Sequence, residues 1–262
     1  MKVTVATFLF LFLLPRSITA DRLDGRYSFS LTTFDPKGKL AQVERATHAA
    51  YLGTPVIGVC TQHGIFLCAP QILPSPLMID DGTARFFTVS KSIAVAHSGI
   101  DGRIVVAAAQ RMTVEYEFTY DEEMPIEAFL EEISLLFQEY TMKAGCRPFG
   151  CSLLVAHLEN DNNCLYRIDP SGAVERCGSS GIIGSTMGDT LKRLKELTAD
   201  DSKDLDESDL LRVMKDSLNE VSKKTRSDTI SLMKIKFLTA RLSTDGLTIA
   251  KYDDNEEDTN QV

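Results

Sequence analysis

The sequence lacks a long basic run, and its charge balance is acidic. Among 262 residues, 28 Lys and Arg stand against 37 Asp and Glu, which gives a formal net charge of −9 at pH 7. A protein that follows the phosphates of DNA or RNA needs a concentrated set of basic side chains. We therefore expect no nucleic-acid partner.

Metal and cofactor motifs are also missing. The six cysteines contain no CxxC pair, and the four histidines show no paired ligand spacing. The glycine-rich stretch 178–188 does not end in GK[ST], and Ser98 does not lie in a G-x-S-x-G elbow. These absences predict no metal and no cofactor, and they favour free thiols over a disulfide framework. We expect 178–188 to be a flexible connection between a strand and a helix.

Long apolar runs are absent except at the N-terminus. Residues 1–20 contain an apolar run from Val3 to Leu14, a helix-breaking Pro15 and a small residue at Ala20. This pattern predicts a secretory signal, and the run is too short for a stable membrane span, which needs about 20 residues. Two alternatives stay open: an extension without signal function, and an upstream stretch wrongly joined to the gene. The absence of any N-x-Ser/Thr glycosylation site weighs against a secreted chain.

What the sequence does contain is a regular succession of helical and strand patterns. Apolar residues recur at helical spacing over 38–52, 101–118, 126–143, 185–197 and 206–224. β-prone runs predict strands at 55–61, 65–69, 92–99, 151–157, 164–169, 173–178, 231–242 and 247–252. The run at 92–99 is mostly apolar, so we expect it to be buried on both faces. The inward face of 101–118 is expected to carry Ile104, Val105, Ala108 and Met112.

This order of elements predicts one layered domain over residues 21–252. Each pair of helices must cover one face of a sheet, and two blocks of strands must bury their inner faces together. We therefore predict an α/β fold, in the broad α+β sense, built as a four-layer α/β/β/α sandwich. Residues 253–262 are acidic and without apolar periodicity, so we expect a disordered, solvated tail.

A set of short motifs then narrows the family. Residues 27–46 read YSFSLTTFDPKGKLAQVERA, and later come Ser98-Gly99, QEYT at 138–141, RPFG at 147–150 and DPSG at 169–172. In this order and spacing, the chain from Tyr27 to Tyr252 resembles the proteasome alpha subunit family. The resemblance implies the N-terminal-nucleophile hydrolase fold in a non-catalytic ring subunit of the 20S core, located in the cytoplasm and nucleus. It also implies the partners: other proteasome alpha and beta subunits in stacked rings, and a regulatory particle.

The same resemblance implies roles for the start of the domain. The pore-closing tail and its reverse turn correspond to Tyr27, Ser28, Phe29 and Pro36. The first turn of a ring-contact helix corresponds to Gln42, Val43 and Glu44. Proline fixes φ and Gly38 relieves the turn, so we expect the tail to leave the helix at a defined angle. An ordinary N-terminal cap is the alternative.

A catalytic threonine is the competing hypothesis. A threonine nucleophile of this fold uses its own free α-amine as the base, so the chain must be cut immediately before it. Thr54, at the start of the first predicted hairpin strand, is the best candidate. By the spacing of active subunits, its supporting acid and lysine would fall near Pro70 and Phe86, and neither residue ionises. We therefore expect no catalytic residue in this chain.

Several positions depart from the family pattern. Arg45 stands where the family has Tyr, and Asp35 replaces a common Ser before the proline of the turn. The stretch 70–74 contains no lysine, whereas the family carries lysines there that pair with an activator's terminal carboxylate. We predict that the cleft of this subunit holds no activator tail through a salt bridge. Together with residues 1–20, these departures leave open a compartment-targeted paralogue outside the ring, beginning at Asp21.

Overall fold

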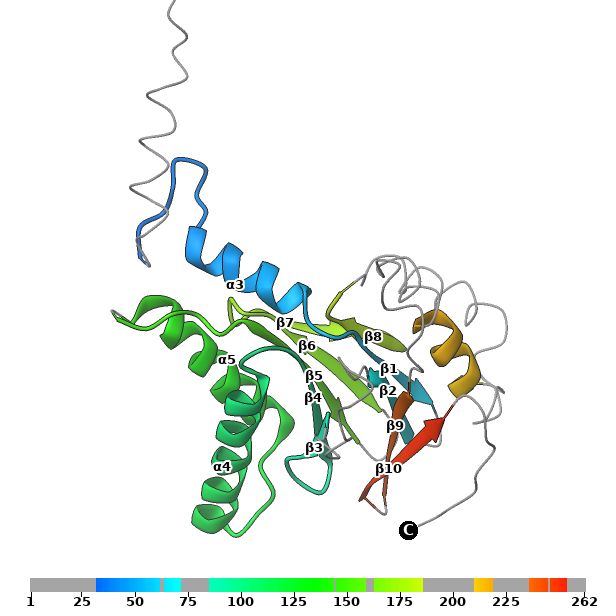
Figure 1. Cartoon of the computed structure of the whole chain (residues 1–262). Helices are drawn as coiled ribbons and strands as arrows, with labels where there is room; N and C mark the ends of the chain where they lie inside the picture. Colours follow the sequence, from blue (N-terminus) through cyan, green and yellow to red (C-terminus); the bar gives the residue numbers. More distant parts are fainter. Residues whose placement is uncertain are drawn as a thin grey trace, which may run out of the picture.

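The computed structural model describes residues 32–61, 64–71, 85–143, 145–158, 163–185, 210–218, 236–244 and 246–253. Within this part, two antiparallel sheets of five strands each form the middle of the molecule (Figure 1). Several predicted features lie outside the described residues: the signal-like segment 1–20, the gate residues Tyr27, Ser28 and Phe29, helical residues 186–197, and the tail from residue 254.

The first sheet orders its strands β10-β9-β2-β1-β8. Their bounds are β1 (Val56–Thr61), β2 (Gly64–Gln71), β8 (Ser180–Ile183), β9 (Lys236–Ser243) and β10 (Gly246–Asp253). β1 and β2 form the predicted hairpin, in which Ile57 lies opposite Cys68 and Thr61 lies opposite Gly64. β10 extends through Asp253, the first residue of the predicted tail.

The second sheet orders its strands β3-β4-β5-β6-β7. Their bounds are β3 (Phe86–Thr88), β4 (Ile93–Gly99), β5 (Cys151–His157), β6 (Cys164–Ile168) and β7 (Val174–Cys177). Val95 of β4 lies opposite Val155 of β5, and Leu165 of β6 lies opposite Cys177 of β7. The first four residues of β4 are buried, which confirms that side chains on both of its faces are covered there.

Helices cover the outer faces of the two sheets. α4 (Gly102–Tyr120) and α5 (Ile126–Met142) lie on the second sheet (Figure 1), and a helix over 210–218 packs Met214 and Leu218 on the first. Between the sheets, side chains such as Leu67, Leu154 and Leu165 form a separate apolar layer. These four layers confirm the predicted α/β/β/α sandwich.

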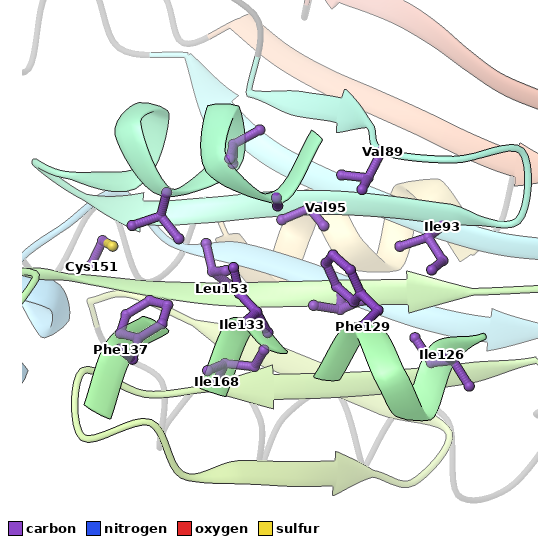
Figure 2. Close-up of a cluster of buried hydrophobic side chains, with 14 of the residues drawn as sticks. Val89, Ile93, Val95, Ile126, Phe129, Ile133, Phe137, Cys151, Leu153 and Ile168 are labelled. Atoms are coloured by element: carbon purple, nitrogen blue, oxygen red, sulfur yellow. The ribbon is translucent and has the colours of Figure 1, made fainter. Parts of the chain in front are cut away.

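The packing of α5 follows directly from its sequence. Ile126, Phe129, Ile133 and Phe137 recur at three- and four-residue spacing, and they are buried against β4, β5 and β6 (Figure 2). Pro125 stands immediately before the helix, where its missing N–H costs no helical hydrogen bond. Burial of each large apolar side chain stabilises the fold by about 1.5–3 kcal/mol.

Two local predictions are wrong. Val105 is buried on the inward face of α4 as expected, but Ile104 is 63% exposed, because the helix meets the sheet through Val105 together with Val106, Ala109 and Thr113. The stretch 178–188, expected to be a flexible connection, contains β8, which pairs with β1. Gly181 of β8 is needed for packing, because a Cβ at this position would come within 3.0 Å of Leu154.

Candidate functional site

A rigid turn precedes the N-terminal helix α3 (Ala41–Tyr51). The Asp35 carboxylate accepts hydrogen bonds from the backbone N–H groups of Lys37 (2.9 Å) and Lys39 (2.8 Å). The N–H of Gly38 donates to the carbonyl of Asp35 at 2.9 Å, and the φ of 76° at Gly38 suits glycine. Pro36 lies exposed within this turn. The turn is therefore where the sequence predicted it, and Asp35, which departs from the family pattern, is its main side-chain acceptor.

The predicted ring-contact residues lie in the first turn of α3. Gln42 and Val43 are half-buried, while Glu44 is exposed and accepts a 2.5 Å hydrogen bond from the Lys39 ammonium group. More than half of each charged side chain is open to solvent, so water screens this ion pair and it adds little to stability. The pair instead joins the turn to the helix and limits the conformations of both.

A groove lies between the turn and the outer side of α3. Its volume is about 660 Å³, and its apolar lining includes Phe34, Leu40, Val43 and Tyr51. Phe34 is 62% exposed and Tyr51 is 44% exposed. The groove therefore presents apolar surface directly beside the residues that the family resemblance assigns to ring contact.

The inner side of α3 packs closely on β4 and β5 through small residues. Ala46 and Ala50 are buried, and the Ser98 hydroxyl donates a 3.3 Å hydrogen bond to the carbonyl of Ala50. Gly53, just after the helix, lies so near Gly99 that a Cβ on Gly53 would come within 2.3 Å of its backbone nitrogen. The helix is thus held against the ends of the strands by close backbone packing.

Thr54 directly follows Gly53, so this close packing fixes the position of its backbone. Its nitrogen is part of the peptide bond with Gly53, whose carbonyl accepts a 3.0 Å hydrogen bond from the N–H of Ser185. The two positions expected to support a nucleophile hold Pro70 and Phe86, both buried apolar side chains in strands. At these positions the site offers neither a free amine nor an ionisable group that could activate Thr54.

An ion pair that the sequence did not predict supports the strand ends beneath α3. The two terminal nitrogens of Arg147 donate to the two carboxylate oxygens of Asp101 at 2.5 and 2.7 Å, and the N–H of Gly150 donates to the same carboxylate at 2.7 Å. Gly150 in turn lies close to Ala49 of α3. The bonds from Arg147 hold the pKa of Asp101 below its usual range, against the effect of burial.

Only Arg147 belongs to one of the sequence motifs named above, and nothing in the sequence linked it to Asp101. Asp101 follows Ser98-Gly99, and Arg147 begins the RPFG motif, 46 residues later in the chain. The spacing of a single sequence carries no signal for such a long-range contact. The structure therefore adds a positioning element to the site rather than a reactive one.

Within the described residues, His48, His97 and His157 do not converge on a ligand site. His97 stacks on Phe87 with ring centroids 5.7 Å apart, and burial, with help from Arg85 and Arg103, lowers its pKa to about 4. In the described ranges, no three His, Cys, Asp or Glu side chains are grouped to hold a metal ion. None of the helices in those ranges combines the length and apolar content required to cross a membrane.

Comparison with known proteins agrees with this architecture. The family model described as "Proteasome subunit" matches residues 50–236. Proteins named proteasome subunit alpha type-2 are similar to this chain: 44% identical over 147 residues in Trypanosoma brucei brucei, covering 55% of this chain and 64% of that protein. The Drosophila melanogaster protein is 39% identical over 150 residues, covering 56% and 64%. The Dictyostelium discoideum protein is 34% identical over 181 residues, covering 68% and 77%.

The first two matches thus span just under two thirds of the relatives' length. Within the family, the stretch from Tyr27 to Glu44 most resembles the alpha type-2 subunit, and the names of these relatives confirm that resemblance. The family model covers well over half of the chain and includes both sheets up to the start of β9. This chain belongs to the proteasome subunit family.

Proposed function

We propose that the chain is a non-catalytic alpha-ring subunit of the 20S proteasome core, with a structural and pore-gating role in ubiquitin-dependent protein degradation. The observation that carries this proposal is α3, which packs across the ends of β4 and β5 immediately before Thr54. A cut before Thr54 would remove this helix together with its buried Ala46 and Ala50. The chain therefore keeps a covering helix where a processed hydrolase would expose a nucleophile.

The proposed partners are other alpha subunits beside the chain and beta subunits in the stacked ring. The groove beside α3 supports the lateral contact, because Val43 and Glu44 line it. A regulatory particle is a further proposed partner, reached through the same outer end of the molecule. By family resemblance, the complex works in the cytoplasm and nucleus.

The gating role is proposed for Tyr27, Ser28 and Phe29, upstream of the described turn. The hydrogen bonds of Asp35 and the fixed φ of Pro36 support it, because they set the direction in which the chain enters the turn. This direction is the property that a pore-closing tail requires.

Removal of residues 21–31 from this subunit tests the gating role in assembled particles. The particles should still contain all their subunits, and their peptide hydrolysis should rise because the pore is less closed. Thr54→Ala serves as the matched control and should leave the hydrolysis rate unchanged. A fall in activity with Thr54→Ala, or no change after the truncation, would contradict the proposal.

A compartment-targeted paralogue outside the ring is the second candidate, and residues 1–20 are the observation that favours it. This candidate predicts a mature chain that begins at Asp21 and forms a monomer or a dimer. Sequencing of the N-terminal peptide from native protein separates the two candidates.

A further inference from the structure

Two half-buried thiols from different sheets face the same interior layer. Cys60 of β1 and Cys177 of β7 both pack against the apolar cluster between the sheets. Side chains alternate between the two faces of a strand, and this alternation agrees with the shared cluster. Val56, a member of the cluster, lies on the same side of β1 as Cys60. Leu165, which lies opposite Cys177, is also a member of the cluster. The two cysteines therefore point into one shared space.

Backbone contacts bring the two thiols to the same end of this layer. The N–H of Cys60 donates a 2.8 Å hydrogen bond to the carbonyl of Ser179, only two residues after Cys177. Gly58, two residues before Cys60, lies opposite Gly181 of β8. A Cβ on Gly181 would come within 2.9 Å of the Cys177 sulfur, so this sulfur lies directly over the glycine.

The strand pairing then places Cys60 beside that sulfur. Since Gly58 is paired with Gly181, Cys60 is the same-face diagonal neighbour of Gly181. Neither glycine has a side chain to separate the two cysteines. Cys177 and Leu154 fill the space above Gly181, and Leu67, Leu154 and Leu165 fill the space above Gly58.

The third nearby thiol has a different environment. Cys164 lies on β6 with Tyr166, on the side that faces α4 and α5, and its sulfur accepts a 2.9 Å hydrogen bond from the Arg176 guanidinium. Besides burial, Cys164 also raises the pKa of Cys60, and it does so more strongly than Cys177. Its side chain is nonetheless directed by Arg176 and not by the layer between the sheets.

We propose that Cys60 and Cys177 are a redox-sensitive pair that forms a disulfide between the two sheets when the chain meets a small-molecule disulfide oxidant such as oxidised glutathione. One cysteine, as thiolate, attacks a sulfur of the oxidant and releases one glutathione thiolate. The second cysteine then attacks the protein sulfur of this mixed disulfide and releases the other. The protein loses two electrons and two protons, and the oxidant becomes two molecules of glutathione.

The environment of the pair sets the conditions for this reaction. Burial raises the pKa of Cys60 to about 12, and the neighbouring thiols Cys164 and Cys177 act in the same direction. Burial also raises the pKa of Cys177. Both thiols therefore stay reduced in a reducing compartment and react slowly near neutral pH, and the rate of disulfide formation rises with pH. The bond would report whether the chain has entered an oxidising compartment.

Peptide mapping of the full chain tests the pair. Protein purified under reducing conditions is incubated with oxidised glutathione at pH 8.5, alkylated, digested without reductant and analysed by mass spectrometry. We expect a cross-linked peptide that contains Cys60 and Cys177, disappears on reduction and accompanies the loss of two titratable thiols. The thermal midpoint of the oxidised chain should rise by about 5–10 °C, because the bond closes a loop of more than a hundred residues.

Variants define the specificity of the bond. Cys60→Ser and Cys177→Ser should each abolish the cross-link, whereas Cys146→Ser, also at a half-buried cysteine, should retain it. A cross-link between Cys60 and Cys164, or mixed glutathione disulfides without any cross-link, would overturn the assignment. Peptide mapping of the oxidised chain without substitutions shows which cysteines are linked, even if a variant fails to fold.

Discussion

α3 and α5 are both amphipathic helices, but they differ in what covers them. α5 buries Ile126, Phe129, Ile133, Phe137 and Thr141 on the second sheet. α3 buries two alanines, and its outer side borders a groove that contains the exposed Phe34 and Tyr51. The position of α5 is therefore set by the chain's own core. The outer surface of α3 is covered by no described part of the chain, and the proposed ring contact would cover it.

The largest effect is expected where α5 meets the core. Phe137→Ala should lower the free energy of unfolding by about 3–5 kcal/mol, because the side chain is fully buried and packs against Phe149 with ring centroids 5.5 Å apart. Phe118→Ala, at a side chain that is 91% exposed, should change it by no more than about 0.5 kcal/mol. Urea unfolding followed by circular dichroism measures both. Equal losses of unfolding free energy in the two variants would contradict the claim that the buried face of α5 stabilises the core.

A smaller effect is expected at the ion pair between Asp101 and Arg147. Arg147→Ala should lower the free energy of unfolding by about 2 kcal/mol, because it leaves the buried Asp101 carboxylate with fewer donors. Lys143→Ala, at a pair with Glu139 in which both side chains are more than half exposed, is the control and should cost less.

The same pair predicts a dependence on pH. The folded-state pKa of Asp101 is lowered, so its stabilisation is complete above the unfolded value of about 3.9 and is lost as the pH falls through the lower folded value. Asp101→Asn should reduce the slope of stability against pH below about 4. An unchanged slope in thermal melts across this range would show that the pair contributes nothing.

The outer face of α3 should affect assembly more than stability. Val43→Asp should change the free energy of unfolding by about 1 kcal/mol or less, and it should reduce recovery of alpha partners about tenfold, because it places a charge in an apolar contact. Ile249→Asp, at an exposed residue of β10, is the matched control. Quantitative mass spectrometry of native complexes measures recovery, and equal losses for both variants would exclude a specific role for the groove.

The smallest effect is expected for activator tails. The described end of the relevant stretch, Pro70 and Gln71, is buried and contains no cation. A tail peptide should therefore gain no measurable salt-bridge contribution from this chain. A structure of the particle with a tail carboxylate held by a cation of this chain would refute the prediction.

The regular elements were predictable because local periodicity determines them. Periodicities such as the apolar spacing of α5 and the apolar run of β4 gave the elements, and their order along the chain led to the sandwich. The phase of α4 was predicted only in part: Val105 is buried and Met112 packs against the core, but Ile104 is exposed, since the face toward the sheet depends on how closely the helix can approach. β8 was missed for a related reason: its glycines resemble a loop, yet Gly181 is required by contact with Leu154.

The candidate site was predictable only in part. The turn at Pro36 and the start of α3 follow from local residues, and both are where the sequence predicted them. The support from Asp101 and Arg147 depends on a contact between segments 46 residues apart. The groove beside α3 is lined by one local segment, 34–51, but its volume depends on how the turn folds against the helix, which the apolar spacing does not give. The proposed roles in gating and ring contact depend on other chains, so the sequence of this chain reaches them through family resemblance.

Native affinity purification through a C-terminal tag, with identification of partner chains and of the N-terminal peptide, tests the central claim most directly. The proposed ring role predicts that alpha and beta subunits are recovered with this chain in one large particle. Recovery of a small species that begins at Asp21, without proteasome partners, would contradict it.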